Sequence, residues 1–120
     1  MRILVAFEPE YQAYQGVMVA SVRILRPHAK VESATLDRLG DEVKRFDPHL
    51  VICSQPNTVD PGGKIAWVEL SIHSTRPSKI CVGGRYSESV NPALETLLAI
   101  VDEVEELMRT DSRQGECPPR

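Results

Sequence analysis

The sequence predicts one α/β domain built around a mostly parallel sheet. Short apolar runs alternate with segments in which apolar residues recur every three or four positions, the pattern of strands and helices that follow one another. The connection between the last two strand-like runs is too short for a parallel crossover. We therefore expect a central parallel sheet with an antiparallel hairpin after it, covered by three main helices.

The first half of the chain predicts the order strand, helix, strand, helix, strand. Strands are expected at 2–7, 30–34 and 50–53, and helices at about 10–25 and 36–46. The stripe that indicates the first helix consists of Tyr14, Val17, Met18, Ser21 and Leu25. Proline follows both helices closely and ends them, because it cannot continue a helix.

The second half departs from this alternation. A loop rich in turn residues, 55–63, stands where another helix would be expected. Strands are expected at 66–72 and 79–82, and the six residues between them force an antiparallel pair. In the first of these strands Ala66, Val68, Leu70 and Ile72 share one side, and Trp67 lies on the other.

The chain is expected to close with its strongest amphipathic helix. Asn91 and Pro92 supply an N-cap and a first-turn proline, and apolar residues then recur at helical spacing as far as Met108. We expect residues 1–109 to form one domain and residues 110–120 to be a flexible tail. The second half of the fold is thus a truncated version of a regular alternating α/β layout.

Composition excludes several classes of function. The formal net charge is −3 and the basic residues are scattered, so a nucleic-acid partner is not expected. No apolar run approaches the length of a membrane span, and we expect a cytoplasmic protein with no membrane contact. The cysteines and histidines stand apart, so neither a metal nor another cofactor is predicted, and Cys53 and Cys81 are expected to be buried, reduced thiols.

Two segments resemble the receiver domains of two-component signalling, which have a flavodoxin-like fold. Residues 2–11 resemble the first strand and turn of that family, and residues 46–54 resemble the approach to its third strand. The resemblance implies a three-layer sandwich, an acidic pair that binds magnesium after strand one, and a phospho-accepting aspartate at the end of strand three.

The chain departs from the family at both positions. The acidic pair is Phe7-Glu8 and the acceptor position is Ser54. One carboxylate cannot hold magnesium as two would, and a serine is not the carboxylate nucleophile of receiver chemistry. Arg85 is the only cation near the place where the family has a lysine after its last strand. Phosphorylation in the manner of the family is therefore not expected.

Two functions remain open. The first is a non-enzymatic, receiver-like interaction or signalling module, a homodimer or a module for another protein partner. The alternative is a protein or enzyme that binds a small molecule or anion beyond the carboxyl ends of the strands. Its candidate ligand-binding residues are Glu8, Ser54, Asn57, Thr58 and Arg85. Glu8 and Ser54 could equally serve as a turn acid and a hydroxyl that caps backbone groups.

The homodimer is predicted from the expected layers. The central strands are apolar on both faces, yet only the second helix is expected on the second face. Either a partner subunit or the hairpin must cover the rest of that face. Trp67 lies on it, so we expect Trp67 to be an interface residue or to pack beneath the loop at 55–64.

Overall fold

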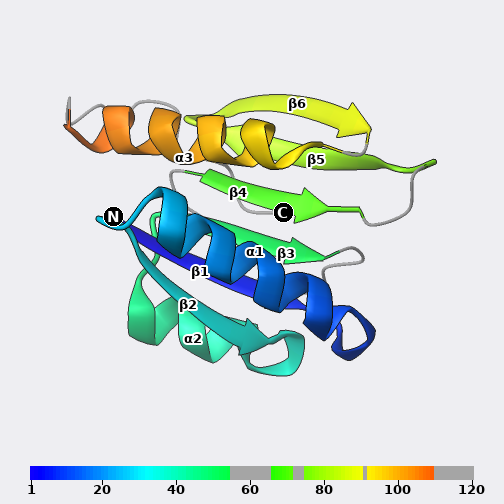
Figure 1. Cartoon of the computed structure of the whole chain (residues 1–120). Coiled ribbons are helices and arrows are strands. Elements are labelled where there is room, and N and C mark those ends of the chain that lie inside the picture. The colour runs from blue at the N-terminus through cyan, green and yellow to red at the C-terminus, as the bar shows by residue number, and fades with distance from the viewer. Residues whose placement is uncertain (55–65, 72–74, 91, 110–120) are drawn as a thin grey trace.

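The protein is a three-layer α/β structure in which one mixed sheet separates two helical layers (Figure 1). The computed structural model describes residues 1–54, 66–71, 75–90 and 92–109. The strands are β1 (Arg2–Phe7), β2 (Lys30–Thr35), β3 (Leu50–Ser54), β4 (Ala66–Leu70), β5 (Pro77–Val82) and β6 (Arg85–Val90). The helices are α1 (Gln12–Leu25), α2 (Leu39–Phe46) and α3 (Leu94–Arg109). One turn of 3-10 helix precedes α1 (Pro9–Tyr11) and another precedes α2 (Leu36–Arg38).

The six strands are ordered β2-β1-β3-β4-β5-β6. The pairs formed by β1, β2, β3 and β4 are all parallel, and β4–β5 and β5–β6 are antiparallel. The antiparallel pairing predicted for the two strands after residue 65 is therefore confirmed. The carboxyl ends of the parallel strands all lie at the same end of the sheet, and this is where ligands of open α/β sheets bind.

Each face of the sheet has its own apolar core. Side chains of α1 and α3 pack on the face that carries Val5 and Val68, and side chains of α2 pack on the face that carries Leu4 and Trp67. The alternation predicted for β4 is confirmed at four positions, because Ala66, Val68 and Leu70 lie in one core and Trp67 in the other. The fifth, Ile72, lies outside the described residues. None of the helices in the described ranges combines the length and apolar character needed to cross a bilayer.

Helix α1 buries a side that shares only Met18 with its predicted stripe. The buried side chains are Gln15, Met18, Val19 and Val22. Tyr14, Val17 and Leu25, which the stripe included, are exposed. The physical reason is that α1 is apolar on nearly every side, so periodicity alone does not select the side that meets the sheet.

Strand β6 was not predicted. Its sequence is polar and it forms one edge of the sheet, so it has neither the apolar run nor the burial that indicates a strand. Gly83 and Gly84, which join β5 to β6, both have positive φ angles of 57° and 81°. Two such residues between paired strands form a tight hairpin turn, because only glycine adopts these angles without strain.

Candidate functional site

The fold brings two predicted site residues, Glu8 and Ser54, together. Strands β1 and β3 are parallel neighbours, and Ala6 is level with Cys53. The residues that follow the two strands therefore meet at the carboxyl ends of the sheet. The Glu8 N–H donates a hydrogen bond of 2.9 Å to Ser54 Oγ, and the Ser54 side chain is fully buried. The serine hydroxyl thus accepts a bond from the backbone turn that leaves β1. This is the capping role rather than that of an exposed nucleophile.

The residue beside Glu8 is part of the core. Phe7 is fully buried and its ring stacks on Tyr14, with centroids 5.6 Å apart and an interplanar angle of 18°. The position at which the receiver family has a second acid is therefore filled by an aromatic side chain under α1. Within the described ranges, no group of three or more histidine, cysteine, aspartate or glutamate residues is arranged to hold a metal ion.

The other three predicted ligand-binding residues do not join this pair. Asn57 and Thr58 lie outside the described residues. Arg85 lies at the start of β6, next to Val82, and Val82 is level with Ala66 at the amino ends of the parallel strands. Its guanidinium forms an ion pair with Glu103 of α3. The expected placement of Arg85 was wrong because β5 runs antiparallel and carries the chain back to the amino ends of the parallel strands.

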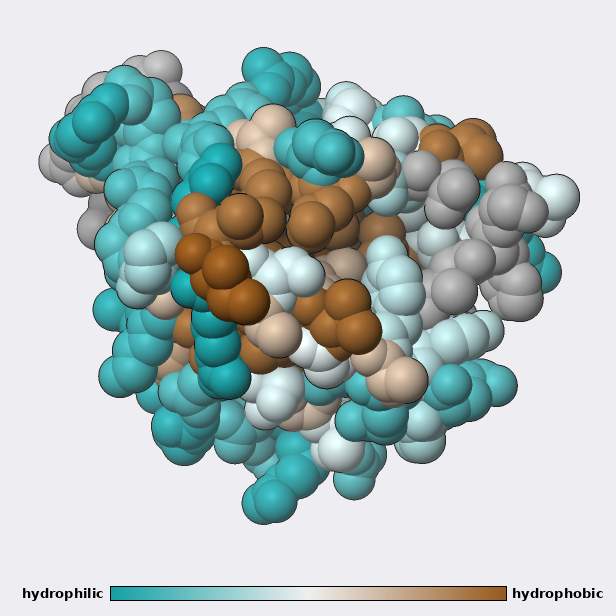
Figure 2. All heavy atoms as spheres, in the orientation of Figure 1, coloured by the Kyte–Doolittle hydropathy of each residue, from teal (hydrophilic) through white to brown (hydrophobic). Residues whose placement is uncertain are grey.

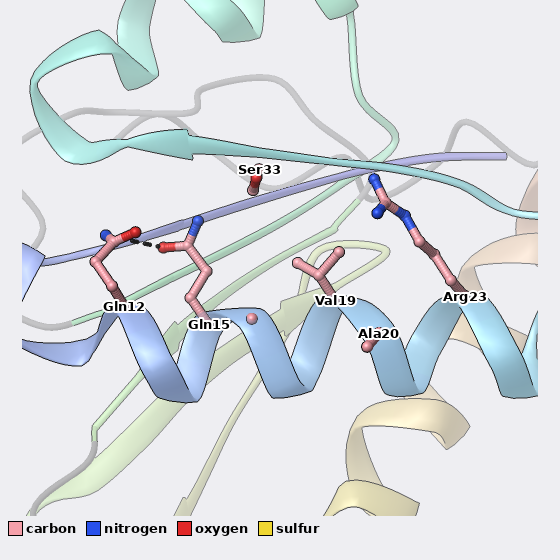
Figure 3. Close-up of a pocket in the computed structure, with 7 residues that line it drawn as sticks. Gln12, Gln15, Val19, Ala20, Arg23 and Ser33 are labelled. Atoms are coloured by element: carbon pink, nitrogen blue, oxygen red, sulfur yellow. Dashed lines mark hydrogen bonds between the residues drawn. The ribbon is translucent and has the colours of Figure 1, made fainter.

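A buried amide side chain near the carboxyl end of β1, that of Gln15, was missed in the sequence. Gln15 is 5% exposed, and its Oε1 accepts a 2.9 Å hydrogen bond from the Phe7 N–H. Its Nε2 donates to the carbonyl oxygen of Ala34 at 3.3 Å, so one side chain links the backbones of β1 and β2. Figure 3 shows Gln15 on α1 beside Gln12. The only signal in the sequence is a polar residue at helical spacing from Met18 and Val22.

Gln15 also lines a groove between α1 and the edge strand β2. The groove has a volume of about 270 Å³, and its wall includes Gln12, Gly16, Arg23 and Ser33. The guanidinium of Arg23 is bound to the fold itself, because its Nη2 donates a 2.7 Å hydrogen bond to the Val31 carbonyl. The groove is slightly smaller than the roughly 300–1,000 Å³ of most small-molecule sites, and two of its polar side chains, Gln15 and Arg23, already bond to backbone groups.

Trp67 is buried within the chain, at 1% exposure. Its ring lies edge-on to Tyr86 of β6, with centroids 5.9 Å apart. The loop at 55–64, under which it was expected to pack, lies outside the described residues. The interface role of Trp67 stays a prediction, but a side chain with this burial presents almost no surface to a partner.

The burial of Trp67 also removes the original reason for a dimer. Its neighbours on the same face, Cys53 and Cys81, are fully buried as well. The face expected to be open between the central strands is therefore closed at these positions. A homodimer stays a prediction, and it requires a different surface.

The cysteines depart from expectation at one position. Cys53 is a buried thiol whose sulfur donates to the Val68 carbonyl at 3.5 Å, as expected for an inert core thiol. Cys81 is in a disulfide. The expectation of a reduced Cys81 was wrong. Disulfides are typical of oxidising compartments, so the cysteines give no support to a cytoplasmic location.

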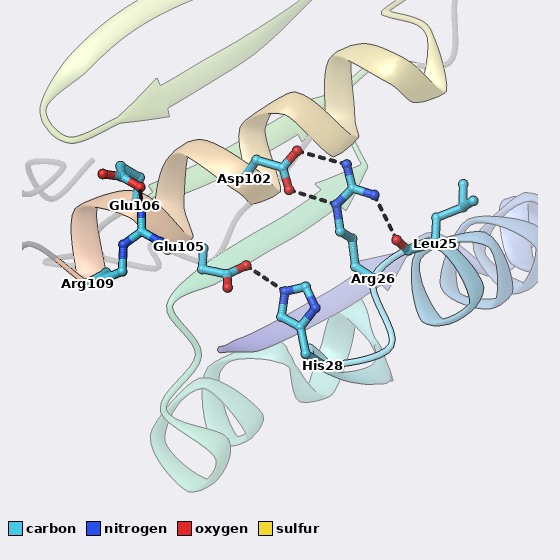
Figure 4. A network of polar contacts seen from close by, with 7 residues as sticks. All are labelled: Leu25, Arg26, His28, Asp102, Glu105, Glu106 and Arg109. Carbon is cyan, nitrogen blue, oxygen red and sulfur yellow. Dashed lines mark hydrogen bonds and ion pairs between the residues drawn. The ribbon is translucent and has the colours of Figure 1, made fainter.

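One ion pair and one histidine–carboxylate hydrogen bond join the turn after α1 to α3 (Figure 4). Arg26 binds both carboxylate oxygens of Asp102, at 2.7 and 2.8 Å, and His28 Nε2 lies 2.6 Å from a carboxylate oxygen of Glu105. The hydrogen bond from Arg26 holds the pKa of the Asp102 carboxyl below its ordinary value. Both contacts are solvent-exposed, so they contribute little to stability, and α3 is held mainly by the apolar side chains that it packs on the sheet.

The face on which α1 and α3 lie carries a gathering of apolar side chains (Figure 2). Seven large apolar residues are exposed in the described part of the chain, and five of them belong to these two helices. The five residues are Tyr14, Val17, Ile24, Leu25 and Leu94. Exposed apolar patches can mark protein or membrane interaction sites or ligand-binding grooves. No protein family, curated protein or solved structure matches the chain.

Proposed function

We propose that this chain is a non-enzymatic, receiver-like interaction module that acts through contact with protein and is not switched by phosphorylation. The observation that carries the proposal is the hydrogen bond between the Glu8 N–H and Ser54 Oγ. It commits the strand-end hydroxyl to the backbone at the position where receiver chemistry needs a carboxylate nucleophile. With Phe7 in the core, Glu8 is the remaining acid of the family's pair.

The strand order supports the receiver-like part of the proposal. The order β2-β1-β3-β4 with parallel pairing is also the order of the flavodoxin-like sheet. The departure lies in β5 and β6, which follow β4 as antiparallel strands. A module that retains the parallel half and the helix α1, but lacks the acidic pair and the acceptor, is suited to binding rather than to phosphoryl transfer.

Incubation with acetyl phosphate and Mg²⁺ followed by intact-mass spectrometry tests the proposal. We expect no gain of mass, because Ser54 is buried and hydrogen-bonded to the backbone. A gain of one phosphoryl group that Ser54→Ala abolishes, and that Ser33→Ala does not, would overturn it. Ser33 is the matched control because it is an exposed serine on β2.

A thermal-shift panel of nucleotides and small anions tests the alternative, a ligand site at the strand ends. A ligand at one hundred times its dissociation constant stabilises a protein by about 2.7 kcal/mol. We expect a flat response across the panel. A stabilisation that Glu8→Gln removes and Glu10→Gln retains would favour the small-molecule site over the interaction module.

A further inference from the structure

Helix α1 presents an apolar row to solvent. The row consists of Ala13, Val17, Ala20 and Ile24, all exposed, and we refer to these four residues as the outer stripe. Val17 is 67% exposed and Ile24 is 75% exposed. The stripe lies directly opposite the buried side of the helix, so its side chains take no part in the core of a single chain. Of the 14 residues of α1, Arg23 alone is charged.

The spacing within the outer stripe is the spacing of a helix-pairing seam. Its members are separated by four, three and four residues, which is the a and d pattern of a coiled coil. The β-branched residues Val17 and Ile24 alternate with alanines. One helix thus carries two knobs and two small positions in regular order.

These knobs and small positions complement each other when two copies of α1 run antiparallel. Val17 then faces Ala20 of the partner subunit, and Ile24 faces Ala13 of the partner subunit. Both pairs are centred on the same point of the helix, between Met18 and Val19, so one two-fold axis satisfies both. A parallel pair would instead set valine against valine and alanine against alanine, leaving uneven layers. Shape therefore favours the antiparallel arrangement.

We propose that the outer stripe of α1 is a homodimer interface, in which α1 packs antiparallel against α1 of a second copy of the chain. This inference rests on the proposed function, because it names the surface and the partner of the interaction module. It also replaces the open second face as the reason for the homodimer.

Two further features fit this occupant. Arg23 lies near the end of the helix, and its guanidinium is bonded to the Val31 carbonyl, so an antiparallel pair does not bring like charges together. Gly16 lies beside the stripe, and a Cβ at this position would meet nothing within 4 Å. The fold of one chain therefore does not require glycine there, and the missing side chain leaves room for a second helix to approach closely.

The small size of the surface indicates a weak contact. Val17 and Ile24 are the two large side chains of the outer stripe. The flanking residues Tyr14, Leu25 and Leu94 must be covered as well if two copies are to bury the roughly 1,000 Å² that a specific interface needs. An apolar hollow of about 140 Å³ between Tyr14 and Leu94 adjoins the stripe and adds to the area that a partner can fill. We therefore expect a dimer that forms in the micromolar range.

Sedimentation velocity of the full chain between about 1 and 100 μM tests the interface. We expect the mass to rise towards twice the 13.4 kDa of one chain as the concentration increases. Val17→Glu and Ala20→Lys should each remain monomeric, because a charge is set against an apolar partner. An equimolar mixture of the two variants should dimerise again, since residues 17 and 20 face each other only in the antiparallel arrangement.

Val90→Glu is the matched control, because Val90 on β6 is 59% exposed and lies on another element. It should dimerise as the wild type does, and circular dichroism should show that all three variants are folded. A wild type that stays monomeric at about 100 μM would overturn the inference, as would a dimer that Val17→Glu leaves intact or a mixture that fails to pair. Those results leave the non-enzymatic proposal standing, with another protein as partner. Phosphorylation of Ser54 would refute that proposal whatever the oligomeric state.

Discussion

Replacing Gln15 by leucine tests whether the amide in the core is a structural link. Leucine has a similar volume and an equal or better helix propensity, so packing and α1 itself should be retained. The change removes the acceptor of the buried Phe7 N–H, at 2.9 Å, and a donor to the Ala34 carbonyl, at 3.3 Å. A buried donor left without its bond costs about 1–3 kcal/mol. We therefore expect Gln15→Leu to lower the free energy of unfolding by about that amount.

The matched control is Gln12→Leu, the same substitution three residues away on α1. Gln12 is exposed and its Nε2 makes a longer bond of 3.3 Å to the Phe7 carbonyl, so we expect a loss of less than about 1 kcal/mol. Urea unfolding followed by circular dichroism measures both changes, provided that the denaturant slope stays constant. Equal losses for the two variants, or a gain of stability in Gln15→Leu, would refute the role assigned to this amide.

Three further predictions concern other parts of the fold. Trp67→Ala should lower the free energy of unfolding by about 3–5 kcal/mol, because it empties a fully buried aromatic site, and light scattering should show an unchanged oligomeric state; a lost dimer with full stability would restore Trp67 as an interface residue. Gly16→Ala should stabilise the dilute protein by about 0.5–1 kcal/mol and so raise its melting temperature, because alanine has a higher helix propensity than glycine, yet it should weaken the dimer at high concentration. If the variant raises the melting temperature and strengthens the dimer together, close approach at this residue is refuted. Asp102→Asn should lower the melting temperature slightly at neutral pH, and the difference should disappear in acid: the folded pKa of Asp102 is depressed by Arg26, so its contribution is present above the ordinary aspartate value of about 3.9 and is lost as the pH falls through the folded pKa. A difference that persists in acid would show that packing, not charge, is what the variant removes.

The elements that could be predicted from sequence are those in which one pattern dominates. The runs of β1 and β3 are apolar throughout because both faces of these strands are covered, and α3 has one clear apolar side. The antiparallel pairing of β4 and β5 followed from the length of the connection alone. In these cases a local physical constraint leaves a single solution.

The features that escaped prediction depend on tertiary context. Strand β6 is polar because it lies at the edge, and its only sign is the Gly83-Gly84 turn, which also fits a bulge. Arg85 was misplaced for another reason: the antiparallel direction of β5, which was predicted, carries the chain back to the amino ends of the parallel strands. The buried side of α1 could not be chosen because the opposite side is apolar too. In our account this ambiguity is the sequence signature of a helix that meets the sheet on one side and a second copy of the chain on the other.

Amide hydrogen exchange at several protein concentrations tests most directly whether α1, and not another surface, is where this chain makes its contacts. Exchange reports local opening and burial segment by segment, so one experiment compares every described element. We predict that raising the concentration slows exchange in residues 12–25 and leaves residues 85–90 of the edge strand unchanged. Slower exchange confined to β6, or no change in α1 at any concentration, would contradict the account.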